Sequence, residues 1–297
     1  MKKIAFFFLL TFAAQAQQEA LRMTYPFLPL AINPAEAGAQ KIFSAKGVFR
    51  IKPLFQMIGG ASSSQQFTSI DMPLKTGDWG LGFLGFNTDQ SYATSSGMIS
   101  SNLGLTAVAS RHWSWGRGHQ FSLGANAGIN QYPILGRSGT SEMLASVGVG
   151  IAYRKEALTL GISKPTNRLD GLGDAPLYLQ ASYYFPVANL HTLKVGTVVR
   201  KDLETKFDMN AVFWFQEKVG FGLWYQQTGS EFGDPALLGS IEVPLGINFR
   251  VGYSYDFLGK NVTTLGSSTT SEAAGFHQIF ISYNLDFGLG KLGQFRP

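Results

Sequence analysis

Histidine is the side chain most often used for acid–base chemistry near neutral pH, and the chain has four of them. His112, His119 and His191 flank predicted short turns, where we interpret them as interfacial polar residues. His277 opens the last predicted strand, with Glu272 and Asp256 as the nearest candidate carboxylates. A histidine at a strand end is more often a surface residue than a catalyst, and no G-x-S-x-G motif is present. We therefore predict that the chain is not an enzyme.

The sequence offers little metal or redox chemistry. It has no cysteine, which excludes thiolate metal sites, disulfides and thiol catalysis. The run from Asp170 to Asp174 carries two carboxylates that could bind a hard cation. It lacks the ligand spacing of an EF-hand, and a solvated turn is the better interpretation. We expect neither a metal nor a cofactor.

The first residues have the layout of a signal peptide. Lys2 and Lys3 precede an apolar run from Ile4 to Ala14, and Ala14-Gln15-Ala16 provides a small-residue cleavage pattern after Ala16. The run is too short to span a bilayer. The formal net charge is +5, of which Lys2 and Lys3 supply two, so the mature chain is only mildly basic and predicts no nucleic-acid partner.

Beyond residue 41 the hydrophobic pattern has a period of two, typical of strands with one apolar and one polar face. In one example, Phe121, Leu123 and Ala125 alternate with Ser122 and Gly124. Most segments span about 9 to 13 residues, which suits tilted membrane-crossing strands better than a soluble sandwich. We predict a transmembrane antiparallel β-barrel of about fourteen strands in the outer membrane. The predicted strands are 41–51, 63–73, 78–88, 97–112, 119–132, 143–154, 157–164, 176–186, 191–200, 206–215, 218–228, 236–243, 247–257 and 276–287.

Short and long connections alternate along these strands, as expected if short turns face the periplasm and long loops face outward. Aromatic residues cluster at the strand ends, which indicates two girdles in contact with outer-membrane lipid. The predicted periplasmic girdle contains Trp113, Trp115, Phe185, Trp214, Phe215 and Phe287. The predicted outer girdle contains Tyr132, Trp224, Tyr225 and Tyr255.

The polar faces must line the lumen, and a barrel of this size leaves space for water, inward loops or a plug. The lumen-facing polar candidates are Lys194, Arg200, Asp208, Glu242, Arg250 and Asp286. Residues 17–40 contain three prolines yet are rich in apolar side chains, so this segment lies either at the periplasmic mouth or inside the lumen. The expected regions are a signal peptide (1–16), this N-terminal segment (17–40), the barrel (41–287) and a C-terminal tail (288–297).

The run from Tyr25 to Gly38, which includes Asn33-Pro34-Ala35, resembles the opening of the PorP/SprF family of type IX secretion outer-membrane proteins. The end of the chain is similar too, in Tyr255-Asp256-Phe257 followed by Gly275-Phe276-His277. Glu36 stands where the family often has an aromatic residue. The family-motif candidates are Tyr25, Asn33, Pro34, Ala35, Gly38, Asp256 and His277.

The resemblance implies a role in the secretion or gliding motility of the Bacteroidota. Its implied partners are a secreted protein with a C-terminal sorting domain and other type IX or periplasmic components. We therefore expect a non-enzymatic barrel that binds or anchors a secreted protein at the cell surface. A passive channel for small solutes is the alternative, and an outer-membrane hydrolase that uses His277 comes third.

Overall fold

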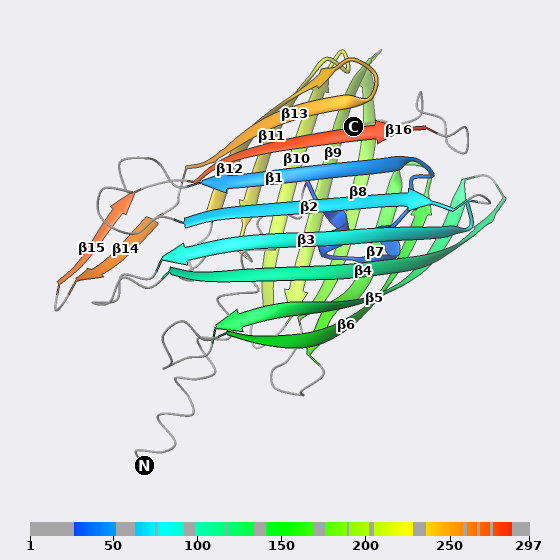
Figure 1. Cartoon of the computed structure of the whole chain (residues 1–297). Helices are drawn as coiled ribbons and strands as arrows, with labels where there is room; N and C mark the ends of the chain where they lie inside the picture. Colours follow the sequence, from blue (N-terminus) through cyan, green and yellow to red (C-terminus); the bar gives the residue numbers. More distant parts are fainter. Residues whose placement is uncertain are drawn as a thin grey trace.

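The computed structural model describes residues 27–51, 63–74, 77–91, 99–116, 118–133, 141–168, 176–188, 190–201, 205–227, 236–257, 260–265, 268–273 and 276–286. Fourteen strands close into one antiparallel barrel, as the sequence predicted (Figure 1). Each strand pairs with its neighbours along the wall, and β1 closes the barrel by pairing with β16. The wall strands are β1 (Phe43–Ile51), β2 (Ser63–Pro73), β3 (Trp79–Ser91), β4 (Ile99–Trp115), β5 (His119–Pro133), β6 (Ser141–Lys155), β7 (Leu158–Arg168), β8 (Leu177–Ala188), β9 (His191–Lys201), β10 (Thr205–Phe215), β11 (Val219–Gln226), β12 (Ala236–Leu245), β13 (Phe249–Asp256) and β16 (His277–Leu285).

Each wall strand alternates an outward apolar face with an inward polar face. On β5, Leu123 is 46% exposed on the outside, whereas Ser122 is 1% exposed on the inside. The same contrast separates Ile279 from Gln278 on β16. Side chains on successive strand residues point to opposite faces, so the period-two pattern becomes a lipid-facing surface and a polar lumen. Among the described residues, no helix is long and apolar enough to cross a membrane.

The two ends of the barrel carry different connections. At one end the strands are joined by short turns, and at the other mostly by longer segments, with β9–β10 as the exception (Figure 1). We call these the short-turn end and the long-loop end. The sequence missed a hairpin at the long-loop end, where β14 (Lys260–Leu265) pairs with β15 (Ser268–Ala273) beyond the barrel wall. It also placed Pro165 in a loop, but β7 continues to Arg168 through an irregularity opposite Val147 and Val149.

Residues 27–42, which directly precede β1, lie inside the barrel (Figure 1). It contains two short 3₁₀ helices, η1 (Pro29–Ala31) and η2 (Pro34–Glu36). Each begins with a proline, a residue that has no backbone N–H and a φ already suited to a first helical position. We call residues 27–42 the plug. Most of its side chains are buried, with Leu28 and Ala35 fully inaccessible to solvent.

Two aromatic assignments from the sequence were wrong. Trp214 and Trp224 are 1% and 4% exposed and point into the lumen, so they belong to neither girdle. Their even numbers place them on the inward register of β10 and β11, while Phe213 and Tyr225 take the outward positions. Proximity to a strand end had suggested the girdle, but the register decides the face.

Candidate functional site

The centre of the plug is Asn33, which is fully buried. Its side-chain oxygen accepts a hydrogen bond from the backbone N–H of Ala35 at 3.0 Å and so caps η2. Its side-chain nitrogen donates to the carbonyl oxygen of Ile151 on β6 at 3.1 Å. One asparagine therefore fixes the local turn of the plug and also ties it to the wall.

Glycines on the wall make room for this contact. A Cβ atom added at Gly150 would lie 2.1 Å from the Asn33 side-chain oxygen, and one at Gly124 would lie 2.3 Å from the Ala35 nitrogen. At Gly80 the added atom would lie 2.0 Å from the Ala37 carbonyl oxygen. All three distances are far below van der Waals contact. The glycines of the inward face thus let the plug backbone approach the wall directly.

The Ala37 carbonyl is held by two side chains of β4. Ser110 Oγ donates to it at 2.6 Å, and His112 Nε2 lies 3.0 Å away. A carbonyl only accepts hydrogen bonds, so the imidazole carries its proton on Nε2. Nδ1 is then the acceptor for the hydroxyl of Ser122 at 2.8 Å. His112 is 1% exposed, so its interpretation as an interfacial residue was wrong. β4 extends to Trp115, so His112 lies within the strand and not at its end. It shares the inward face with Ser110.

The end of the plug is fixed at Gly38. Its backbone N–H donates to a carboxylate oxygen of Asp71 on β2 at 3.0 Å. Its φ is +61°, and an added Cβ would lie 2.7 Å from the Met72 carbonyl oxygen. Both the backbone angle and the lack of space require glycine.

Side chains from β6 and from two further strands, β7 and β8, bind the middle of the plug. Glu36 forms an ion pair with Arg154 of β6 and accepts a hydrogen bond from the Gln180 amide of β8 at 3.2 Å. Ser163 of β7 donates to the Ile32 carbonyl at 2.8 Å. Glu36 therefore has a charged and a polar partner on the wall.

Apolar contacts seat the first turn of the plug. The Phe27 ring stacks on Phe280 with centroids 3.9 Å apart and also contacts Trp224. Leu28 packs in a cluster with Val48 and Phe67. The plug therefore contacts the wall on both sides of the lumen.

The structure places five of the six lumen-facing polar candidates along the inward register, spread over both halves of the barrel. Arg250 Nη1 lies 3.6 Å from the Glu242 carboxylate near the short-turn end, where Lys194 is also found. Asp208 is fully buried near the long-loop end and accepts from the Gln227 backbone N–H at 2.8 Å. Arg200 is 2% exposed on β9, and Asp286 follows β16 directly.

The family-motif candidates separate into two groups. Asn33, Pro34, Ala35 and Gly38 all belong to the plug, whereas Tyr25 lies outside the described residues. Asp256 and His277 are the remaining two.

These two residues do not form a pair. Asp256 is 2% exposed on the inward face of β13. His277 lies on the outward register of β16, where Nδ1 is 2.5 Å from the Tyr253 hydroxyl. The expectation that Asp256 lies beside His277 was wrong, because the two side chains point to opposite faces of the wall.

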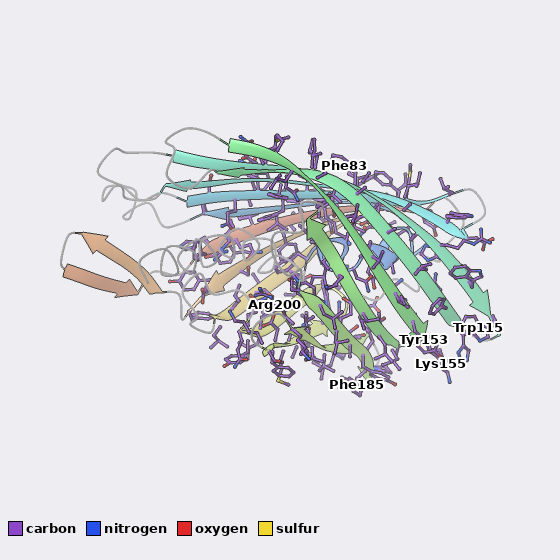
Figure 2. All side chains as sticks on the ribbon, turned by 90° about the horizontal axis from the view of Figure 1, so that it is seen from below. Phe83, Trp115, Tyr153, Lys155, Phe185 and Arg200 are labelled. Carbon is purple, nitrogen blue, oxygen red and sulfur yellow. The ribbon has the colours of Figure 1, made fainter. Side chains whose placement is uncertain are left out.

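The outer rim of the short-turn end carries the remaining histidines. His119 Nδ1 lies 2.8 Å from the Tyr153 hydroxyl, and the His119 ring stacks on Trp115. Figure 2 shows Trp115, Tyr153, Lys155 and Phe185 at this end. His191 stacks in the same way on Phe213. Within the described ranges no three His, Asp or Glu residues form a group that could hold a metal ion, and the Asp170–Asp174 candidate lies outside those ranges.

Sequence reasoning missed the residues that hold the plug: Asp71, Ser110, His112, Arg154 and the inward glycines. One signal was available. Gly124, Gly128, Gly148 and Gly150 recur on the polar face of two adjacent strands, a pattern that marks close approach of another backbone.

The comparisons with known proteins agree with this architecture. No curated protein matches the sequence. The barrel is similar to Omp33 of Acinetobacter baumannii (TM-score 0.50, 7% identity, 84% of this chain and 100% of that chain). It is also similar to a FadL homologue of Pseudomonas aeruginosa (TM-score 0.54, 10% identity, 86% and 93%). A third similar structure is a TodX mutant described as a monoaromatic hydrocarbon channel (TM-score 0.52, 11% identity, 86% and 93%). At these identities the likeness establishes the fold of an outer-membrane barrel and nothing finer.

The family comparison covers nearly the whole chain. Residues 14–283 match the model described as "Type IX secretion system membrane protein PorP/SprF". This match includes the complete plug and all wall strands up to Tyr283. The chain therefore belongs to the PorP/SprF family of type IX secretion system membrane proteins.

Proposed function

We propose that this barrel is a non-enzymatic component of the type IX secretion or gliding machinery that binds or anchors a secreted partner at the cell surface. The plug is the observation that carries this proposal. Residues 27–42 fill part of the lumen and are tied to the wall by Asn33, Ala37 and Gly38. A barrel whose lumen holds its own chain is better suited to binding at its ends than to free passage of solutes.

The long-loop end is the proposed binding end. It carries the β14–β15 hairpin, a two-stranded sheet that stands apart from the barrel wall (Figure 1). The edges of such a hairpin have unpaired backbone groups, and an extended segment of a partner can add to them as a further strand. A secreted protein with a C-terminal sorting domain is the partner implied by the family.

A deletion strain complemented with hairpin variants tests the proposal. Replacing residues 258–275 with a short Gly-Ser linker should release the partner from the cell surface while the barrel still folds. Affinity purification of the full-length chain from native membranes should recover a large secreted protein, and the linker variant should not. An unchanged surface proteome and unchanged gliding in the deletion strain would contradict the proposal.

A passive channel is the second candidate, because a cavity with charged lining lies beside the plug. Removing residues 27–38 separates the two candidates. In planar bilayers the full-length barrel should conduct weakly, whereas the deletion should open a wide water-filled pore. Full conductance by the intact chain would instead favour the channel.

A further inference from the structure

The polar contacts of the plug lie on one side of the lumen. The hydrogen bonds and the ion pair described above connect it to β2, β4, β6, β7 and β8. Between the plug and a wall built from β1, β8–β13 and β16 lies a cavity that is partly open to solvent. A concave site that combines apolar and aromatic side chains with a few charged groups is typical of small-molecule binding.

The lining of this cavity changes from charged to apolar with depth. Lys46, Lys194, Glu242 and Arg250 lie within a few residues of the short-turn ends of their strands. Deeper residues are apolar or aromatic. They are Phe27, Val48, Trp224 and Phe280. The charged end also admits water, since the Arg250 side chain is 20% exposed.

The charged end has an excess of cations. Lys46, Lys194 and Arg250 are close enough to interact electrostatically with one another, whereas Glu242 is the single carboxylate in the described lining. Asp71 and Glu36 also interact with Lys46 from behind the lining. Glu36 is neutralised by its ion pair with Arg154, so the three cations face two further carboxylates, Glu242 and Asp71. Like charges gathered away from bulk water repel strongly, and an anion bound among them relieves that repulsion.

We propose that this cavity is a binding site for an organic anion with an apolar body, entered from the short-turn end. The carboxylate of such a ligand sits among Lys46, Lys194 and Arg250, and its apolar part packs against Phe27 and Trp224. A fatty acid and the C-terminus of a peptide share this chemistry. The site does not depend on the partner proposed above, since it is at the opposite end of the barrel from the hairpin.

Calorimetric titration of the full-length chain in detergent tests the site. The probes are octanoate and N-acetyl-Leu-Phe with a free carboxylate, each compared with its uncharged amide. The variants are Lys194→Gln and the paired change Arg250→Gln with Glu242→Gln, which removes the ion pair without changing the net charge. Lys155→Gln is the control, because Lys155 is exposed on the outer face at the same end of the barrel.

At least one acid should bind about tenfold more tightly than its amide, and both cavity variants should lose this preference while Lys155→Gln keeps it. Binding of octanoate alone identifies a lipid-like ligand, and binding of the peptide alone identifies a protein C-terminus. Failure of both acids to bind, equal binding of acid and amide, or unchanged binding by Lys194→Gln overturns the proposal. Heat-dependent mobility in electrophoresis confirms that each variant has folded. The results of the titrations do not test the surface partner proposed above.

Discussion

The substitution Gly80→Ala should loosen the plug. The new Cβ would lie 2.0 Å from the Ala37 carbonyl oxygen and 2.6 Å from its carbon, whereas ordinary contact begins at 3.4 Å. Both neighbours are backbone atoms, so the plug has to withdraw by more than 1 Å. That movement separates the Ala37 carbonyl from Ser110 and His112, which now donate to it at 2.6 and 3.0 Å.

The cost follows from those two hydrogen bonds. Each is worth about 1 kcal/mol, and a buried carbonyl left without a donor costs roughly 1–3 kcal/mol. These terms sum to about 3–5 kcal/mol, and the lower value already increases the population with a withdrawn plug on the order of a hundredfold. Gly47→Ala is the matched control, because its added Cβ meets only the Phe49 ring, at 3.9 Å.

A single introduced cysteine can report this opening, since the chain has none of its own. Ala39 is 4% exposed, so Ala39→Cys should react slowly with a maleimide in the folded barrel. Gly80→Ala should accelerate that reaction by about the same hundredfold, as labelling follows the open population. Gln40→Cys is exposed and checks the reagent. Equal rates in the Gly80→Ala and Gly47→Ala backgrounds would refute the argument that close backbone approach seats the plug.

Three further substitutions test separate parts of the structure. Asn33→Leu removes both the cap of η2 and the bond to the wall, and it should cost about 2 kcal/mol in denaturant unfolding, whereas Asn33→Ser keeps a capping oxygen and should cost less. Glu36→Gln leaves Arg154 partly buried without its ion pair and should lower stability by about 3 kcal/mol, with the double change Glu36→Gln and Arg154→Gln recovering part of the loss in a double-mutant cycle. Leu223→Arg on the outward face of β11 should cost roughly 2–4 kcal/mol of folding into lipid vesicles, whereas Val187→Arg near the rim should cost about 1 kcal/mol or less.

Local patterns in the sequence determined the wall of this protein. Alternation such as Phe121, Leu123 and Ala125 against Ser122 and Gly124 reports which face meets lipid, because side chains alternate along any strand. Turn residues then limited the strand lengths and fixed the count at fourteen, which the closed barrel confirms. The exact ends were less certain. Prediction stopped β4 at His112, three residues before its end at Trp115, and this error hid the role of that histidine.

Only the tertiary structure decided what fills the barrel. The sequence showed that residues 17–40 contain both prolines and apolar side chains, and this left two positions open. Whether the segment lies at the periplasmic mouth or inside the lumen depends on contacts between residues far apart in the chain, such as Asn33 with Ile151 and Gly38 with Asp71. Such contacts have no sequence period, because they arise from the curvature of the closed wall and from the space that Gly80, Gly124 and Gly150 leave for another backbone. The wall was therefore readable from local periodicity, whereas the plug and the cationic cavity beside it required the folded barrel.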